Sequence, residues 1–163
     1  MNIMVRTAKL DDLERIVYIE NCCFPEKEAA VYQSLRERLI AFKKSFLVAE
    51  KENEVIGFIN GCVTKQKKLT DELYHSIELH DDAAPNQMIF GLAVAPSAQH
   101  HGVAALLMKK FIKQAEESHK AIITLTCKKD LIPFYEQFGY RDEGKSISSH
   151  GGACWYDMTL YLS

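Results

Sequence analysis

The chain has 163 residues, of which 47% are hydrophobic and 26% are charged, which fits one globular domain with a buried core and excludes a disordered chain. Because 20 basic residues are balanced by 22 acidic ones, the net charge of -2 gives no general attraction to nucleic acid or to a membrane surface. No apolar run approaches the ~20 residues that span a bilayer, and the first residues lack the apolar segment of a secretory signal.

The first half of the chain carries both strand and helix patterns. In order, we predict a strand at 2–8, a helix from Asp11 or Asp12 to about 21, a helix at about 27–43, and antiparallel strands at 46–51 and 55–65. Pro25 separates the two helices, because proline cannot continue a helix. Gly61 interrupts the last of these strands and predicts a bulge. We expect a short helix near 70–75 within the long polar segment that follows.

The second half of the chain is organised around an apolar run, a turn and a strongly helical pattern. In order, we predict a strand at 88–94, a helix at 103–115, a strand at 121–127, a helix at 131–138, and closing strands at 140–148 and 153–162. No repeat, linker or low-complexity segment divides the chain. Residues 1–163 are therefore predicted to form a single α/β domain with a mixed sheet.

The five cysteines predict reduced thiols. Their number is odd, and the sequence contains neither a CxxC pair nor a histidine spacing suited to zinc, so we expect a cytoplasmic protein without a metal site. Cys62 and Cys127 fall in apolar strand patterns, where a buried small side chain is expected rather than a nucleophile. A thiol hydrolase that uses Cys127 is a remote alternative.

The segment between the strand at 88–94 and the helix at 103–115 has the features of an anion site. Backbone N–H groups of residues 99–104 fall at the first turn of a helix, where they lack intrahelical partners and the dipole is positive. Gly102 and Ala104 would let a phosphate approach the backbone closely. Neither GxxxxGK[ST] nor GxGxxG is present, and the spacing alone also fits an ordinary strand-to-helix connection.

Two motifs in this half resemble those of the GNAT superfamily of acyl-CoA-dependent N-acetyltransferases. Residues 99–104, which read QHHGVA, resemble its Q/R-x-x-G-x-G/A signature, and the LAVAP run at 92–96 matches its fourth strand. LIPFYEQFGY at 131–140 resembles the motif in which a helix tyrosine precedes Gly-Phe/Tyr. The nearest likeness is to the arylalkylamine (serotonin) N-acetyltransferase branch. That branch has two strand histidines just before the LAV run, where this chain has Met88 and Phe90.

The resemblance implies a fold, a cofactor and a catalytic residue. The implied fold is a mixed, mostly antiparallel central sheet of about six to seven strands with about four flanking helices. The implied cofactor is acetyl-CoA, and the residues that would bind it are Leu92, Ala93, Val94, Gln99, His100, His101, Gly102, Val103 and Ala104. Tyr135 stands where the family has a general acid for the leaving thiolate, and Lys128 stands where many members have an asparagine near the cofactor.

Residues for the acceptor side are weaker candidates. Those that would line an amine pocket are Phe24, Glu28, His80, Phe90 and Trp155. The general base stays open among Glu28, Glu78, His80, His150 and Asp157.

The predicted reaction is transfer of an acetyl group from acetyl-CoA to a small primary amine, by direct attack on the thioester. An arylalkylamine or a polyamine would fit such a site. A sensor that binds acyl-CoA without turnover and an enzyme that acetylates a lysine or a peptide N-terminus remain alternatives. Because members of the family are often dimers, a homodimer also stays open.

Overall fold

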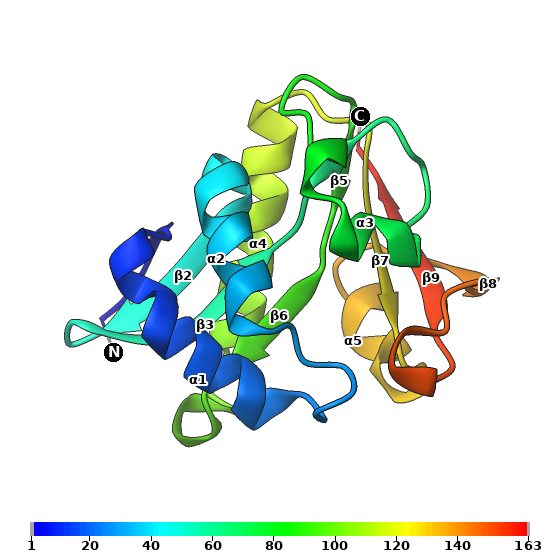
Figure 1. The fold of residues 1–163 in the computed structure, drawn as a ribbon. Helices are drawn as coiled ribbons and strands as arrows, with labels where there is room; N and C mark the ends of the chain where they lie inside the picture. Colours follow the sequence, from blue (N-terminus) through cyan, green and yellow to red (C-terminus); the bar gives the residue numbers. More distant parts are fainter. Residues whose placement is uncertain (1, 163) are drawn as a thin grey trace.

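A computed structural model describes residues 2–162, which form a mixed α/β fold (Figure 1). The helices are α1 (Leu13–Cys23), α2 (Tyr32–Ala41), α3 (Asp71–His75), α4 (Val103–Glu117) and α5 (Ile132–Glu136). The strands are β1 (Ile3–Thr7), β2 (Phe46–Lys51), β3 (Glu54–Asn60), β4 (Val63–Thr64), β5 (Asn86–Met88), β6 (Gly91–Val94), β7 (Ile122–Cys127), β8 (Arg141–Lys145) and β9 (Tyr156–Tyr161). Most lie where the sequence patterns predict them, including the short helix in the long polar segment.

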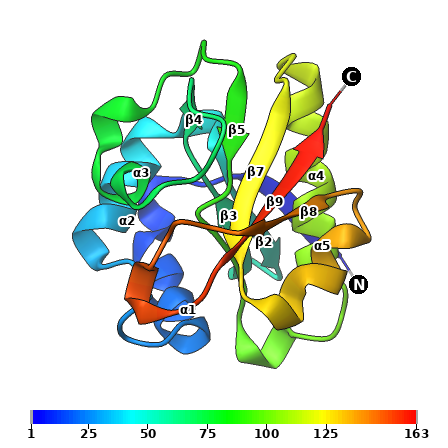
Figure 2. The same cartoon turned by 90° about the vertical axis from the view of Figure 1, so that its right-hand side faces the viewer.

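These strands form two hydrogen-bonded sheets rather than one. One sheet has the order β1-β2-β3-β6 and the other β4-β5-β7-β9-β8. Among the strands described, β5 and β7 are the one parallel pair, so the predicted mixed and mostly antiparallel arrangement is confirmed. Figure 1 shows β6 and β7 diverging toward the end where α1 and α5 lie, and Figure 2 shows β7, β9 and β8 from their outer side.

The predicted single strand at 88–94 is wrong, because the chain changes sheets within it. The amide of Ile89 donates to Thr124 O on β7 at 2.9 Å, whereas the next amide, that of Phe90, donates to Asn60 O on β3 at 2.7 Å. Consecutive peptides therefore bond to different sheets. This switch divides the run into β5 and β6 and leaves β6 at the end of its sheet.

The predicted strand at 55–65 is divided at the same level, and its break depends on a close backbone contact. β3 ends at Asn60 and β4 begins at Val63. A Cβ added to Gly61 would lie only 1.8 Å from the carbonyl oxygen of Met88. The glycine is therefore needed because two chain segments touch here, and the break separates two strands rather than forming a simple bulge.

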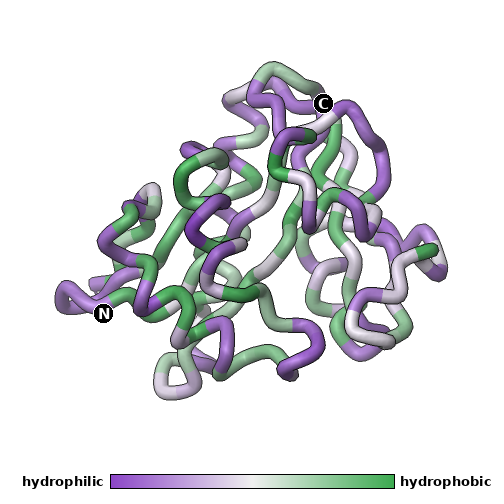
Figure 3. The backbone as a smooth tube through the Cα atoms, in the orientation of Figure 1, coloured by the Kyte–Doolittle hydropathy of each residue, from purple (hydrophilic) through white to green (hydrophobic). Residues whose placement is uncertain are grey.

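Helices cover both faces of the first sheet. α1 packs against β3 and β6, and α4 packs on the other face against β1, β2 and β3. The predicted helix at 27–43 is shorter than expected, because α2 begins at Tyr32 and residues 24–31 form a loop that runs toward the end of β6. Figure 3 shows hydrophobic segments along the central strands and hydrophilic ones at the β2–β3 turn. Within residues 2–162, no helix is long and apolar enough to cross a membrane.

Candidate functional site

A cavity of about 420 Å³ lies between β6 and β7, where the two sheets diverge. Helices α1, α2, α3 and α5 and the loop before β9 complete its wall. The residues that line this cavity include Glu20, Phe24, Glu28, Arg38, Tyr74, Phe90, Gly91, Leu92, Thr126, Cys127, Tyr135, His150 and Trp155. Side chains from both sheets and from both halves of the chain therefore meet in one space.

One wall of this cavity is the outer edge of β6. Ala95 N donates to Ile56 O at 2.8 Å, so antiparallel alternation turns the peptide groups of Ala93 toward β3 and those of Leu92 and Val94 outward. The prediction grouped Ala93 with the other two as a main-chain binding residue. Its hydrogen-bonding groups are instead used within the sheet. The carbonyl of Val94 accepts the side-chain amide of Gln99 at 3.0 Å.

The bend before α4 has the geometry of an anion site. Gly102 is the N-cap with φ +82°, a left-handed conformation that favours glycine, and a Cβ there would meet nothing within 4 Å. Among the described residues 2–162, no side chain caps this end, so the first N–H groups of a 15-residue helix have no side-chain partner and carry the positive end of the helix dipole. His100 and His101 are exposed beside the bend, and Ala104 is half-buried. Val103 is buried in the core and offers only its main chain.

Tyr135 on α5 lines the cavity and is 9% exposed. Within residues 2–162 its hydroxyl makes no hydrogen bond. Burial raises the pKa of Tyr135, and the nearby Cys127 and Tyr74 raise it further. The phenol therefore stays protonated through the physiological range and is free to donate to a molecule in the cavity.

Glu20 on α1 and Arg38 on α2 were missed by sequence reasoning. Glu20 is 5% exposed, and Arg38 is 6% exposed. The carboxylate accepts the amide of Ala30 at 2.8 Å, and the guanidinium donates to Asn60 Oδ1 at 3.3 Å. Burial raises the pKa of Glu20, although the Ala30 amide and the Arg38 and His150 charges act in the opposite direction. In the sequence, each of these two charged residues falls on the apolar face of a helix, and that pattern could have indicated them.

Aromatic side chains form much of the remaining wall. Phe90 lies 4.8 Å from the ring of Tyr74, which in turn stacks on His150 at 4.9 Å and 19°. Arg38 lies over the Phe90 ring at 4.8 Å. Phe24 and Trp155 also line the cavity, as the sequence predicted. The pocket is thus suited to a planar or apolar group.

A salt bridge joins the two sides of the cavity rim. Glu28 Oε2 lies 2.8 Å from Lys128 Nζ, which sits 5.8 Å over the Trp155 ring. The imidazole Nε2 of His150 bonds the carbonyl of Glu28 at 2.9 Å, and Trp155 Nε1 donates to the carbonyl of His150 at 2.8 Å. Glu28 therefore lines the cavity as predicted, but its carboxylate already has a cationic partner.

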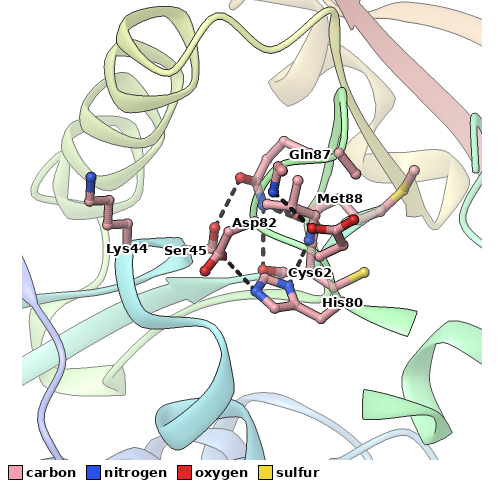
Figure 4. A network of polar contacts seen from close by, with 12 residues as sticks. Lys44, Ser45, Cys62, His80, Asp82, Gln87 and Met88 are labelled. Atoms are coloured by element: carbon pink, nitrogen blue, oxygen red, sulfur yellow. Dashed lines mark hydrogen bonds and ion pairs between the residues drawn. The ribbon is translucent and has the colours of Figure 1, made fainter. Parts of the chain in front are cut away.

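The placement of His80 in an amine pocket is wrong. Its Nδ1 accepts the amide of Val63 at 3.0 Å, so Nε2 carries the proton that bonds Asp82 at 2.8 Å. The ring also packs 4.9 Å from that of Phe42. Figure 4 shows His80 in a polar network with Ser45 and Gln87, away from the residues that line the cavity. Both ring nitrogens are used in holding the polar segment in place.

Two other candidates for the general base also lie elsewhere. Glu78 lines a different hollow next to α2 and α3. Asp157 is buried on β9 and contacts Lys68 Nζ at 3.4 Å.

Cys127 lines the cavity, yet it is a poor nucleophile. Burial raises the pKa of its thiol to about 12, so the reactive thiolate is scarce at neutral pH. This agrees with the expectation of a buried small side chain.

Solved structures of other proteins share the fold of this chain. The chain matches 98% of the loading GNATL domain of CurA from Lyngbya majuscula, with 99% of its own length, a TM-score of 0.85 and 13% identity. It matches 95% of yncA from Salmonella typhimurium, a structure that holds acetyl-CoA, over 100% of its length with a TM-score of 0.74 and 16% identity. At these low sequence identities, both similarities show the fold alone.

A curated relative is more similar in sequence. Serotonin N-acetyltransferase of Mesocricetus auratus is 26% identical over 114 residues, which are 69% of this chain and 53% of that protein. The chain thus spans about half the length of this relative. The model of the acetyltransferase (GNAT) family matches residues 13–140, which include both motifs and most of the cavity wall. This chain therefore belongs to the GNAT family of acetyltransferases.

Proposed function

We propose that the protein transfers the acetyl group of acetyl-CoA to a small primary amine bound in the cavity between β6 and β7. The observation that carries this proposal is the hydroxyl of Tyr135, which has no hydrogen-bond partner in the described part of the chain and shares a cavity with the outward main chain of Leu92. A strand edge binds an extended amide-containing chain, and a free phenol donates a proton to a leaving group. The buried Glu20 lies in the same space.

Acetyl-CoA fits the groups that this site offers. The pantetheine amides would pair with the outward peptide groups of Leu92 and the outward N–H of Val94, as an added strand does. The Val94 carbonyl, in contrast, already accepts from Gln99 and Cys23. The pyrophosphate would meet the free N–H groups at the start of α4, where Gly102 leaves the approach open. The acetyl-CoA held by yncA, a protein of the same fold, supports this choice of acyl donor.

The chemistry takes two protons from the amine nitrogen and delivers one to the leaving sulfur. A primary amine with a pKa near ~10.4 is almost wholly protonated at pH 7, so reaching the neutral nucleophile costs about 4 to 5 kcal/mol. The amine nitrogen then attacks the thioester carbonyl, and the C–S bond breaks. Tyr135 gives its proton to the departing sulfur, whose thiol pKa is near ~8.5, so that a thiol leaves instead of a thiolate.

The wall of the cavity favours an amine with an aromatic group. Phe90, Tyr74 and Trp155 would contact such a ring, and aromatic pairs contribute about 0.5 to 1.5 kcal/mol beyond simple burial. The likeness to serotonin N-acetyltransferase supports the same class of acceptor. We therefore propose an arylalkylamine as the acceptor and place polyamines and lysine peptides second.

Two measurements on one sample test this function. Thermal denaturation with and without acetyl-CoA comes first, because a ligand at 100 times its Kd stabilises by about 2.7 kcal/mol, or roughly 5 to 10 °C here. Free-thiol release is then followed against arylalkylamines, polyamines and lysine peptides. No thermal shift at millimolar acetyl-CoA would contradict the cofactor. A shift without thiol release would favour a sensor, and release with peptides alone would favour a protein acetyltransferase.

A further inference from the structure

Glu20 occupies the end of α1 with one carboxylate oxygen fixed and the other free. Oε2 accepts the amide of Ala30 at 2.8 Å, which holds the side chain in one orientation. Oε1 accepts no hydrogen bond from any residue in the range 2–162, although the side chain is almost fully buried. A buried carboxylate oxygen without a partner is costly, and here it borders a cavity instead of packed protein.

The free oxygen lies close to Gly91, the first residue of β6. A Cβ built on Gly91 would be 4.0 Å from Glu20 Oε1 and 3.8 Å from Asn60 Nδ2. Gly91 directly precedes Leu92, whose peptide groups face outward from β6. The absence of a side chain at residue 91 therefore leaves space between the carboxylate and this edge, close to any thioester bound along it.

The titratable groups around Glu20 belong to three elements: α2, the loop before β9, and α1 itself. Arg38 faces it from α2 and His150 from the loop before β9, and both favour the ionised carboxylate. Cys23 is its neighbour on α1, and burial raises the pKa of that thiol, so it brings no charge at neutral pH. Arg38 keeps its charge although burial lowers its pKa, because guanidinium groups stay protonated in proteins.

We propose that Glu20 is the catalytic base that takes the proton from the acceptor ammonium, and that Arg38 is a positioning residue that keeps this carboxylate ionised. The inference rests on the proposed function, since it assigns a proton acceptor to that reaction. It also explains how a chain without the two strand histidines would deprotonate its substrate. Glu20 approaches the space beside β6 from α1, whereas Met88 and Phe90 hold the strand positions.

The proton balance closes with Glu20 and Tyr135. The ammonium gives one proton to the Glu20 carboxylate, which later releases it to solvent. The nitrogen then forms its bond to the acyl carbon, and the C–S bond breaks as Tyr135 protonates the sulfur. The nitrogen of the adduct loses a second proton, which balances the one that Tyr135 gave. One proton is released per acetyl group transferred.

The other ionisable groups are less suited to this task. Glu28 is held in an ion pair with Lys128 at 2.8 Å, so its carboxylate is already engaged by a cation at the cavity rim. His150 donates its Nε2 proton to the carbonyl of Glu28 and lies stacked against Tyr74. Glu78, His80 and Asp157 do not line the cavity.

The test compares Glu20→Gln with the wild type across pH. Glutamine keeps the length of the side chain and an oxygen for the Ala30 amide, but it cannot take a proton. We expect kcat/KM to fall about a hundredfold or more at pH 7. The wild-type value should be level between the pKa of Glu20 and that of the amine. The variant's value should instead rise tenfold per pH unit up to the amine pKa, because only neutral amine then reacts.

Two further variants and one further substrate sharpen the comparison. Glu20→Asp keeps a carboxylate and should retain the level region at reduced rate. Glu14→Gln changes an exposed glutamate on the same helix and should leave rate and profile unchanged. A fluorinated amine of low pKa needs less help from a base, so the loss in Glu20→Gln should shrink by at least tenfold with it.

A readout without turnover tests the same assignment. In the free protein, NMR of the Glu20 side-chain carboxyl should show it titrating above the ordinary range yet ionised where the enzyme works, and Arg38→Met should raise its pKa further. Unchanged rate and profile in Glu20→Gln, or a carboxyl still protonated at the working pH, would overturn the role of Glu20 while leaving the transferase standing. A wild type that acetylates no amine would remove the proposed function and this inference together.

Discussion

Replacement of Tyr135 by phenylalanine should lower activity and raise stability at the same time. The change deletes one oxygen atom from a side chain that is 9% exposed and leaves its ring contacts with Phe134 and Tyr140 in place. Because the hydroxyl has no hydrogen-bond partner within residues 2–162, its removal breaks no bond and relieves a desolvation cost of about 1 kcal/mol. For a chain of this size that is a rise in Tm of roughly 2 to 4 °C.

The same substitution should lower the catalytic rate. Loss of a general acid lowers kcat by about 10² to 10⁴, and binding of acetyl-CoA should be unchanged because the groups proposed to anchor it lie on β6 and α4. Thermal denaturation, acetyl-CoA binding and thiol release on the same preparation measure all three quantities. A variant that loses stability would show that the hydroxyl has a structural partner. A variant with kcat within twofold of wild type would refute Tyr135 as the acid.

Three other predictions concern the glycines and the buried carboxylate. Gly61→Ala should cost about 3 kcal/mol or more in urea denaturation, because its Cβ would lie 1.8 Å from Met88 O; a mild loss would mean that the two segments separate easily. Gly102→Ala should cost only about 1 kcal/mol for its positive φ, yet weaken acetyl-CoA binding about tenfold by calorimetry, since its Cβ enters the space left for phosphate; unchanged affinity would argue against the anion site. Burial raises the pKa of Glu20, so the folded state holds its proton longer than the unfolded state does, and wild-type stability should fall as pH rises from the ordinary carboxyl pKa of ~4.3 to the raised value. Glu20→Gln should abolish that fall, and identical pH profiles of the free energy of unfolding would contradict it.

Local patterns were enough to predict most elements, including the bend before α4 and the helix that carries Tyr135. The bend at Gly102 depends on backbone conformation at one glycine, and Tyr135 lies in a helix whose signal is carried by neighbouring residues. Such features are properties of short segments. They are readable from one sequence because the residues that cause them are adjacent.

The switch between sheets at Ile89 and Phe90 was not readable in this way. An apolar run looks the same whether its amides bond one neighbouring strand or two, and the partners here are Thr124 and Asn60, far away in the sequence. The prediction that His80 lines an amine pocket was wrong for a related reason. It falls in a polar segment typical of a surface loop, and its burial comes from contact with Phe42 and Val63.

The two proposed proton-transfer groups enter the cavity from different structural units. Glu20 comes from α1, which packs on β3 and β6, whereas Tyr135 comes from α5, next to β8 and β9 (Figure 1). The separation between them therefore depends on how far the two sheets diverge, beyond the point between Ile89 and Phe90 where the chain changes sheets. Because nitrogen and sulfur occupy different sides of the same acyl carbon, a base and an acid on separate walls suit direct attack on the thioester. A mechanism through an acylated enzyme would need a nucleophile between them, and Cys127, whose burial raises its pKa to about 12, does not meet that need.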